Sequence, residues 1–333
     1  MTKIDDILAT IDPKLRKKLH VSSEVEIHKQ PTPSIGLTSA LRGGFAYGRQ
    51  VLIWGNKSAG KSSFCLQMIG EAQKQGKVCA WVDAEASFDP KWAARLGVDT
   101  EQLIYSEARS INDMVDVSTN LIEAGVDVLI VDSISALLPA VYFKKDSDEL
   151  KQLEDTKQIG AEARDMTNAV KMLNYANNRN GQTLLVLISQ QRKNLGGLYA
   201  SNQPTGGEAV KFFSSTIVKL WSSESDNNAI KGTVSNGNRL LESKIGRRVT
   251  WTVDFNKTGP AFVSGDYDFY FQGDNVGIDT VAELVDVAEA KGVIEKGGAW
   301  YTVLGERLQG RSRVIDWVKE DSARQKELES LVV

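Results

Sequence analysis

The sequence predicts an α/β protein whose central sheet is open and mostly parallel and is covered by helices. From about residue 36, short apolar segments alternate with stretches of helical periodicity, as in sheets whose parallel strands are joined by helices. The apolar runs at 126–131 and 183–189 are uninterrupted, which is typical of strands buried on both faces. Past about residue 273 the pattern changes to a helix, glycine-rich turns and a final charged helix. That change predicts a small C-terminal α+β lobe.

The first elements of the core are predicted from periodicity and from helix-end signals. We expect a strand at 50–54, a helix at 61–75, a strand at 77–83 and a helix that begins at Asp89-Pro90. Gly76 is expected to stop the first helix. Aspartate as the N-cap, with proline in the first turn, is a common helix start.

A separate N-terminal segment precedes this core. Apolar residues recur at helical spacing in residues 4–11, and residues 30–34 (QPTPS) are typical of a linker. The predicted parts of the chain are therefore an N-terminal helix and linker at 1–33, the α/β core at 34–273 and the C-terminal lobe at 274–333.

The composition is that of an ordinary globular protein. The 333 residues are 41% hydrophobic and 25% charged, enough for one large domain with a smaller companion. The apolar runs are far shorter than a membrane span, and the first residues, MTKIDDILAT, lack the apolar core of a signal peptide. We therefore expect a cytoplasmic protein with no membrane partner. Because the net charge is −3, any contact with nucleic acid must come from local basic patches.

The segment GNKSAGKSS follows the first predicted strand and fits the phosphate-binding loop (P-loop) pattern G-x-x-x-x-G-K-[ST]. Its residues are Gly55, Asn56, Lys57, Ser58, Ala59, Gly60, Lys61, Ser62 and Ser63. Glycines let backbone N–H groups approach an anion, and the following helix points its N-terminal dipole at the same place. Lys61 can neutralise the outer phosphates of a nucleotide, and the Ser62 hydroxyl can bind Mg²⁺. A glycine-rich turn that binds nothing is the alternative.

Three later strands end in side chains suited to nucleotide hydrolysis, and the ends of parallel strands meet at one sheet edge. Asp132 ends the run VLIVD, where a buried carboxylate is costly unless a cation or hydrogen bonds meet it. It is either a Mg²⁺ partner or a helix N-cap. Glu85 follows the strand at 77–83 and is either the group that activates water or a solvated surface residue. Gln190 can bond a terminal phosphate and so report which nucleotide is bound.

Two segments suggest a surface for nucleic acid. Residues 191–207 are polar, glycine-rich and basic at their start, and loops of this length are usually functional or disordered. In the helix predicted before them, basic and apolar residues each recur every seven positions on opposite faces: Lys157, Arg164 and Lys171 against Ile159, Met166 and Leu173. Such a basic row can follow a phosphate backbone, or it can be an ordinary solvated helix face.

Together these segments resemble the RecA-type recombinases of bacteria and their phages. The resemblance extends from about Ser34 to Lys296 and comprises six motifs in order: GNKSAGKSS, WVDAEASFDPKW, VLIVDSISALLP, LISQQRKNLGG, TGGEAVKFF and IEKGGAWY. It implies a RecA-like P-loop NTPase core and a DNA-dependent ATPase that hydrolyses ATP to ADP and phosphate. It further implies a helical homo-oligomeric filament on single-stranded DNA that pairs with homologous duplex DNA and exchanges strands. ATP would lie between neighbouring subunits, and the N-terminal helix would dock on the next subunit.

The resemblance also assigns roles to individual residues. Lys61 and Ser62 would bind phosphate and Mg²⁺, Asp132 would be the second Mg²⁺ residue, Glu85 would activate water and Gln190 would be the nucleotide switch. Adenine would contact Asp89 and Trp92, the latter by stacking on the indole. The implied DNA-binding residues are Arg164, Lys171, Arg192, Lys193, Gly206, Gly207 and Lys211.

The chain departs from the family pattern at several positions. Lys57 stands where the family usually has an acidic residue. The family usually offers two lysines to the phosphate of the neighbouring subunit. Here only Lys244 matches, because Glu242 replaces the first lysine, so either Arg247 or Arg248 is a candidate for the missing contribution. The segment at 143–155 is longer and more acidic than expected, and the acidic tail is weak. These departures are typical of a divergent member such as a phage protein.

Two other functions use the same nucleotide chemistry. One is a hexameric helicase or motor on the same fold, against which the N-terminal helix and linker favour an open filament. The other is a non-catalytic adaptor that uses ATP only to assemble, against which the presence of both Glu85 and Gln190 weighs.

Overall fold

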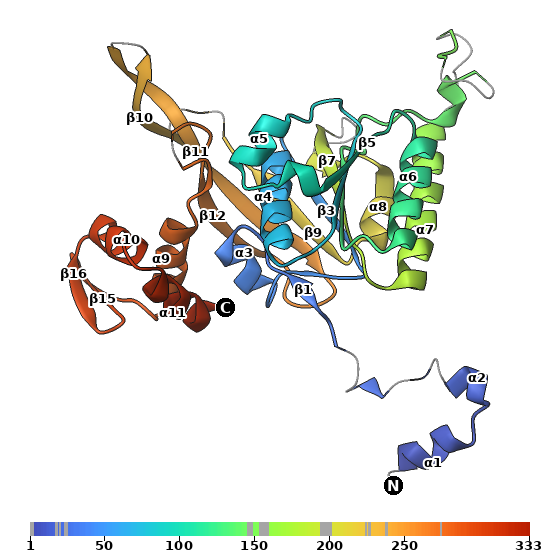
Figure 1. Cartoon of the computed structure of the whole chain (residues 1–333), viewed down its shortest axis with the longest axis horizontal. Helices are drawn as coiled ribbons and strands as arrows, with labels where there is room; N and C mark the ends of the chain where they lie inside the picture. The colour runs from blue at the N-terminus through green and yellow to red at the C-terminus, as the bar shows by residue number, and fades with distance from the viewer. Residues whose placement is uncertain are drawn as a thin grey trace, which may run out of the picture.

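A computed structural model of the chain describes residues 3–16, 19, 21–22, 26–144, 149–152, 160–193, 202–223, 225, 228–236, 239–273 and 275–333. Figure 1 shows a broad central sheet with helices on both faces and a small C-terminal lobe beside one end of it. The N-terminal helices α1 (Lys3–Ala9) and α2 (Pro13–Arg16) lie apart from the sheet.

The central sheet has a parallel part and an antiparallel part. Its strand order is β13-β12-β11-β9-β3-β7-β6-β4-β5. In that order the strands are Gly277–Ile278, Val263–Tyr270, Arg239–Asn256, Thr216–Trp221, Gln50–Gly55, Leu184–Lys193, Val128–Asp132, Cys79–Asp83 and Leu103–Glu107. All neighbours from β9 to β5 pair in parallel, and the pairs from β9 to β13 are antiparallel. The predicted α/β class with a mostly parallel core is confirmed, and its strands lie close to their expected bounds.

Two further strands pair with interior strands of this sheet where these run beyond their neighbours. β10 (Ala229–Asn236) pairs with β11 in a long hairpin that projects from the body in Figure 1. β8 (Asn202–Pro204) pairs with the end of β7.

Helices cover both faces because the parallel strands are apolar on both sides. α4 (Lys61–Lys74) and α5 (Pro90–Arg95) lie on one face. α6 (Ile111–Ala124), α7 (Ala161–Asn180) and α8 (Gly207–Phe213) lie on the other. Alternate residues of β3 show the two layers: Ile53 belongs to the core beneath α4, and Leu52 to the core beneath α6 and α7. With helices on both faces, the carboxyl ends of the parallel strands are left together at one edge of the sheet.

The residues predicted to be a linker instead pack against the core. β1 (Lys29–Gln30) pairs with β2 (Phe45–Ala46), and Gln30, Thr32 and Ser34 are buried. The Thr38 hydroxyl accepts a hydrogen bond from the Thr32 N–H at 2.8 Å. Ser34 is the N-cap of α3 (Ile35–Ala40). Proline, serine and threonine are common both in linkers and before helices, which explains why the sequence pattern was misleading.

The C-terminal lobe has its own small core. It consists of α9 (Thr280–Ala290), β14 (Glu295–Gly297), β15 (Trp300–Val303), β16 (Glu306–Gln309), α10 (Arg311–Lys319) and α11 (Ser322–Val332). Leu284, Val303 and Leu328 are fully buried in it. One side chain of α9 connects the lobe to the main domain: the carboxylate of Glu283 accepts hydrogen bonds from the Ser34 hydroxyl and from the N–H groups of Ile35 and Gly36.

Candidate functional site

The ends of the parallel strands meet around one cavity. Register places Gly55 beside Gln190 and Asp83 beside Asp132. A cavity of about 470 Å³ opens at this edge, and we call it the strand-end cavity. Its lining residues are Lys57, Ser58, Gly60, Lys61, Ser62, Ser63, Glu85, Trp92, Asp132, Ser133, Ile188, Gln190, Arg247, Val249, Phe269 and Phe271. Residues far apart in the sequence are thus brought to one place by the sheet.

The loop between β3 and α4 is held in place by backbone geometry and by one amide side chain. A Cβ atom on Gly55 would lie 1.7 Å from the Leu220 carbonyl oxygen, so only glycine fits there. Gly60 has φ 81° and begins α4 in the left-handed region. Asn56 donates to the Ser222 carbonyl at 2.8 Å and accepts from its N–H at 3.2 Å. Asn56 therefore anchors the loop, whereas Ala59 is buried.

Lys61 and Asp132 are two buried residues of opposite charge that border the strand-end cavity. The Lys61 ammonium donates to the carbonyl oxygens of Gly55 at 3.3 Å and Asn56 at 2.9 Å. Burial lowers the pKa of Lys61, while Asp132 and Glu85 act to raise it. Burial raises the pKa of Asp132 to about 6, opposed by a hydrogen bond with the Ser62 side chain. A carboxylate beside a hydroxyl is a set of hard oxygen donors, which is what Mg²⁺ prefers.

Glu85 is held above the cavity by two donors. Its Oε1 accepts from the Ser133 hydroxyl at 2.5 Å and from the Gln190 side-chain amide at 2.8 Å. The turn that carries Glu85 is fixed by Asp83, which is 2% exposed and accepts from the N–H groups of Glu85, Ser87 and Phe88. The sequence argument did not include Asp83 and Ser133. An aspartate that ends a strand just before a tight turn often bonds the backbone two residues on, and that signal could have indicated Asp83.

Trp92 borders the strand-end cavity beside the start of α4. Its indole N–H donates to the Ser63 hydroxyl at 3.2 Å, and the Arg95 guanidinium lies 5.8 Å from its ring centroid. Asp89 is the N-cap of α5, as predicted, and accepts from the Lys91 N–H at 2.8 Å. Asp89 is not among the residues that line the cavity, so only Trp92 of this predicted pair borders it.

The three basic residues Lys244, Arg247 and Arg248 on β11 lie in different places. Lys244 borders a smaller pocket of about 210 Å³, which it shares with Ser58, Arg247 and other residues. Arg247 borders both this pocket and the strand-end cavity. Arg248 points elsewhere and forms a bidentate pair with Asp268, at 2.9 and 3.3 Å. Of the two candidate arginines, only Arg247 therefore reaches the cavity.

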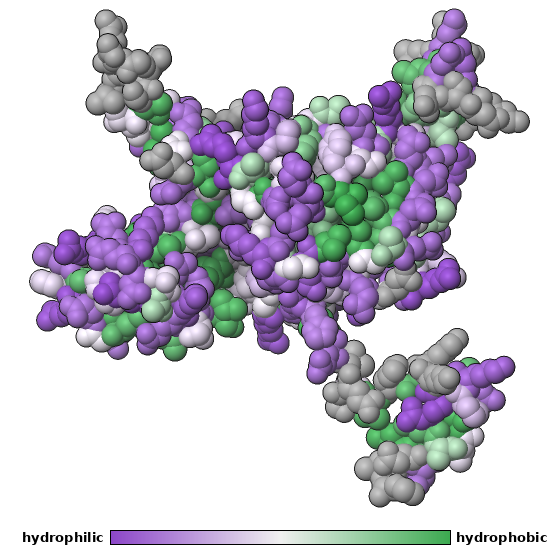
Figure 2. Space-filling model, viewed as in Figure 1, coloured by the Kyte–Doolittle hydropathy of each residue, from purple (hydrophilic) through white to green (hydrophobic). Residues whose placement is uncertain are grey.

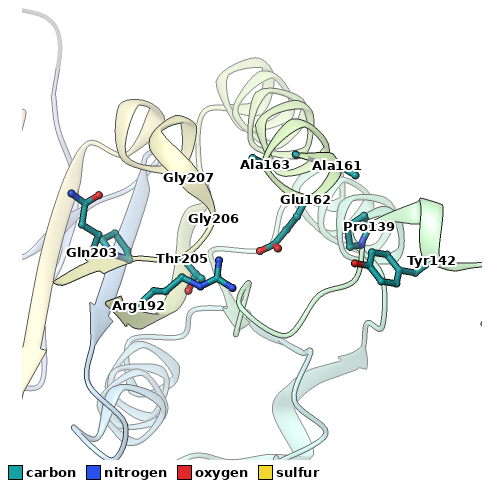
Figure 3. A pocket seen from close by; sticks show the side chains of 12 residues that line it. Pro139, Tyr142, Ala161, Glu162, Ala163, Arg192, Gln203, Thr205, Gly206 and Gly207 are labelled. Carbon is teal, nitrogen blue, oxygen red and sulfur yellow. The ribbon is translucent and has the colours of Figure 1, made fainter. Parts of the chain in front are cut away.

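A second pocket lies between the ends of β7 and β8 and the starts of α7 and α8. It has a volume of about 410 Å³, and we call it the loop pocket. Its lining residues are Pro139, Tyr142, Gly160, Ala161, Glu162, Ala163, Arg192, Gln203, Pro204, Thr205, Gly206 and Gly207. Figure 3 shows the side chains of Arg192, from β7, and Glu162, from α7, projecting into it from opposite sides. Three of the predicted DNA-binding residues, Arg192, Gly206 and Gly207, are therefore in one place.

The other predicted DNA-binding residues are spread more widely. Arg164 and Lys171 are exposed on α7, while Met166 and Leu173 on its other face are buried as expected. Lys211 donates to the side chains of Gln203 at 2.8 Å and Glu208 at 2.9 Å. Lys157, Ile159 and the side chain of Lys193 lie outside the described residues.

A short series of hydrogen bonds connects the two cavities. The Gln190 side chain bonds Glu85, and the Gln190 carbonyl accepts from the Thr205 hydroxyl at 2.9 Å. The Ser135 hydroxyl accepts from the Gln190 N–H at 2.9 Å and bonds the Thr205 hydroxyl at 2.6 Å. Gln190 borders the strand-end cavity and Thr205 borders the loop pocket. Gln190 and Thr205 are thus directly hydrogen-bonded to each other.

Comparison with known proteins agrees with this arrangement. The RecA N-terminal domain model matches residues 3–276, and the RecA C-terminal domain model matches residues 282–333. Protein RecA of Mannheimia haemolytica is 34% identical over 94% of this chain and 81% of its own length. Protein RecA of Bifidobacterium longum is 32% identical over 99% of this chain and 79% of its own length.

A solved structure shares the fold at lower identity. The RadB recombinase crystal structure aligns with 75% of this chain and 98% of its own, with a TM-score of 0.52 and 16% identity. Among helices of the described part of the chain, none has the length and apolar composition needed to cross a bilayer. With both family models matched along nearly its whole length, the chain belongs to the RecA family of ATP-dependent recombinases.

Proposed function

We propose that the chain assembles as a helical filament on single-stranded DNA, pairs it with homologous duplex DNA and exchanges strands under the control of ATP hydrolysis. The observation that carries this proposal is the hydrogen-bonded link from Glu85 through Gln190 to Thr205. It joins a cavity suited to nucleotide hydrolysis to a pocket suited to DNA. The family match favours this function over the helicase and the adaptor.

The strand-end cavity is the proposed ATP site. The N-terminus of α4 and the loop N–H groups would face the phosphates, and the Lys61 ammonium would leave the carbonyl oxygens of Gly55 and Asn56 to neutralise them. The Trp92 indole, which borders the cavity, would stack on the adenine. Asp89, the N-cap of α5, would be a second adenine contact.

Ser62 and Asp132 are the proposed Mg²⁺ residues. The Ser62 side chain acts to lower the pKa of Asp132, and Asp132 is 3% exposed yet borders the cavity with Ser62. Burial penalises its negative charge, so a cation beside it would be favoured. The metal would supply charge neutralisation on the β- and γ-phosphates. The contribution of this chain is a fixed pair of oxygen ligands at the end of β6.

Glu85 is the proposed base for hydrolysis. It would orient a water molecule and accept its proton as the water oxygen bonds the γ-phosphorus. The bond from that phosphorus to the bridging oxygen of ADP then breaks, which releases ADP and phosphate. Glu85 currently accepts hydrogen bonds from Ser133 and Gln190. A γ-phosphate that attracted the Gln190 amide would leave one lone pair of Glu85 available for water.

Gln190 is the proposed link between nucleotide and DNA. Movement of the Gln190 side chain toward a phosphate would displace the end of β7. The Gln190 carbonyl there accepts a hydrogen bond from the Thr205 hydroxyl, so Thr205 would move with it. Thr205, Gly206 and Gly207 border the loop pocket and begin α8. Conversely, DNA that displaced these residues would change the position of Gln190 relative to Glu85.

The proposed DNA contacts surround the loop pocket. Arg192 would bind phosphate, and the backbone at Gly206 and Gly207 would allow close approach of the strand. Arg164 and Lys171 would extend this surface along α7, while Lys193 and Lys211 would contribute from the loop and from α8. Glu162 also faces the pocket (Figure 3), and its charge would oppose phosphate close to it.

Two exposed apolar surfaces support assembly of several copies. Ile4 and Ile7 of α1 are 51% and 55% exposed. Ile104 and Tyr105 on the edge strand β5 are 41% and 42% exposed, and Figure 2 shows a hydrophobic patch on the face where β5 lies. Docking of α1 on another copy would cover apolar surface. Lys244, beside the strand-end cavity, would then be available to the ATP of a neighbouring subunit.

The division of the chain follows from these roles. Residues 1–33 would serve oligomerisation through α1, with Lys29, Gln30 and Thr32 packed on the core; residues 34–273 would be the ATPase core, and 274–333 would be a small lobe. A cytoplasmic location and a phage origin stay predictions from the sequence.

Phosphate release measured with and without single-stranded DNA tests the hydrolysis proposal. DNA should raise the turnover of the unmodified chain, and Glu85→Gln should lower the stimulated rate by about 100-fold or more. ATP binding should persist, because glutamine keeps the size of the side chain but loses the base. Glu101→Gln, on the exposed turn before β5, is the matched control. Full turnover in Glu85→Gln would show that another group activates water.

The salt dependence of DNA binding tests the loop pocket. Arg192→Ala should weaken binding of single-stranded DNA and reduce the slope of log K against log salt by about 0.7, the value for one phosphate contact. Arg179→Ala, at the other end of α7, is the control because its guanidinium pairs with Glu123 at 3.9 Å. An unchanged slope in Arg192→Ala would place the DNA elsewhere.

A further inference from the structure

Arg247 lies on β11, in the antiparallel part of the sheet, and its side chain reaches the P-loop. Its Nη1 donates to the Ser58 carbonyl at 2.9 Å, and its guanidinium carbon lies 5.6 Å from the ring centroid of Phe271. Both contacts are within one chain, and both partners border the strand-end cavity. The side chain is half-buried, so its position is defined by packing as well as by hydrogen bonding.

The alternation of side chains along β11 explains why Arg247 and not Arg248 reaches the cavity. Successive residues of a strand point to opposite faces. Arg248 lies on the other face, where it pairs with Asp268 and borders the pocket beside the C-terminal lobe. Of these two neighbouring arginines, Arg247 alone therefore faces the proposed nucleotide.

The chemistry of the guanidinium suits a phosphate ligand. Arginine has five N–H donors in a planar fork that matches phosphate oxygens, and the Ser58 carbonyl occupies one side of that fork. Lys57 and Lys61 border the same cavity. A triphosphate there would meet positive charge from the P-loop on one side and from β11 on the other.

We propose that Arg247 binds the phosphates of the nucleotide held by its own subunit. This inference rests on the proposed ATP site and adds to it a cation supplied in cis from β11. Arg247 therefore does not replace, from a neighbouring subunit, the lysine whose position Glu242 occupies. The site of each subunit carries its own additional charge, and Lys244 is the only one of the family's two lysine positions that is retained.

Titration of the full-length chain with a fluorescent ADP or ATP analogue, without DNA, tests the contact. Charge-assisted hydrogen bonds are the strong ones, so Arg247→Ala and Arg247→Gln should each weaken binding by about 10- to 100-fold. Arg247→Lys should stay within about fivefold of the unmodified chain because it keeps the charge. Arg248→Gln is the matched control and should bind normally. Thermal unfolding of each variant checks that it folds.

The outcomes separate this inference from the proposed function. An unmodified chain that bound no nucleotide would end the proposed function itself. If that chain binds but Arg247→Ala binds equally well, the inference is wrong. If Arg247→Gln alone binds normally, the side chain merely anchors the Ser58 carbonyl, since an amide N–H can do that without charge, and the inference is again wrong.

Mixed assemblies distinguish action in cis from action in trans. Lys61→Ala subunits retain Arg247, and Arg247→Ala subunits retain Lys61. If Arg247 acted on a neighbour's nucleotide, mixing the two variants on DNA would create complete sites and restore turnover. If Arg247 acts in cis, the turnover of the mixture should not exceed the sum of the turnovers of the two variants alone. The measurement uses an ATP concentration at which the Arg247→Ala variant is far from saturated. Recovery of turnover would overturn the assignment.

Discussion

Asp132 and Glu283 are both buried carboxylates, but the regions around them are built for different purposes. Asp132 is 3% exposed, and burial raises its pKa to about 6, opposed chiefly by the Ser62 side chain. Glu283 is also 3% exposed, and burial raises its pKa to about 7. It accepts from the Ser34 hydroxyl and two backbone N–H groups at the start of α3. Both acids are costly to ionise where they are.

The difference lies in the donors that meet each carboxylate. Asp132 borders the strand-end cavity beside Lys61 and Glu85, so space is available for a ligand that would compensate its charge. Glu283 also borders a pocket, of about 410 Å³, but it joins α9 of the C-terminal lobe to α3 of the main domain, and its oxygen atoms already accept from three donors at that helix start. A buried acid with few donors beside open space indicates a binding site, whereas one whose oxygens are occupied by a hydroxyl and backbone N–H groups indicates a joint between parts.

Asp132→Asn should give the largest effect on activity and the most direct test of this contrast. Asparagine removes the charge that Mg²⁺ would meet, so we expect phosphate release to fall by at least about 100-fold. The free energy of unfolding at pH 7.5 should rise by about 1–3 kcal/mol, because the folded state of the variant no longer holds a desolvated carboxylate. Phosphate release and denaturant unfolding measure the two quantities.

The contrast fails if Asp132→Asn behaves as a structural variant. Loss of stability with little loss of turnover would mean that Asp132 is chiefly a structural hydrogen-bonding group. Asp113→Asn serves as a comparison because Asp113 caps α6 through a bond from the Ser110 N–H at 2.9 Å. It should lose stability and keep its turnover.

Glu283→Ala should show the opposite behaviour. Truncation leaves the Ser34 hydroxyl and the N–H groups of Ile35 and Gly36 without their acceptor. Unpaired buried donors cost about 1–3 kcal/mol each, partly recovered by water, so we expect a loss of about 2–4 kcal/mol in the free energy of unfolding at pH 5, where Glu283 is mostly protonated in the folded chain. Turnover per folded molecule should be unchanged, since Glu283 lies outside the strand-end cavity. A stable Glu283→Ala variant with lower turnover would contradict this division.

The same contrast shows how far sequence reasoning can go. Gly55, Lys61, Asp132 and Gln190 follow apolar strands, and parallel strand ends converge whatever the loops between them do. Their meeting place was therefore predictable from strand order alone. The fold class was predictable for the same reason, since uninterrupted apolar runs that alternate with amphipathic helices have few other solutions.

Contacts that depend on side-chain direction or on long-range packing were not predictable in this way. Ser34 and Glu283 are 249 positions apart, and the sequence around either residue does not indicate that it contacts the other. Arg247 and Arg248 looked equivalent in sequence, and only the register of β11 places one at the cavity. Gln30 and Thr32 were taken for a linker because composition does not distinguish an exposed segment from one that packs against a sheet.

Glu283→Gln gives the smallest effect and separates the charge of the joint from its hydrogen bonds. The folded-state pKa of Glu283 is about 7 and its ordinary value is 4.5. Between these values the folded chain binds more protons than the unfolded chain, so the contribution of Glu283 to stability is present at pH 4.5 and is lost as pH rises to about 7. Glutamine, which never ionises, should unfold with nearly the same free energy as glutamate at pH 5. At pH 8 it should be the more stable of the two, by on the order of 2–3 kcal/mol. Denaturant unfolding of both chains across this range measures the difference. Asp132 is unchanged in both chains, so its own titration cancels in the comparison. If the difference in free energy of unfolding between the two chains stayed constant with pH, the hydrogen bonds at the start of α3 would compensate the buried charge of Glu283 fully.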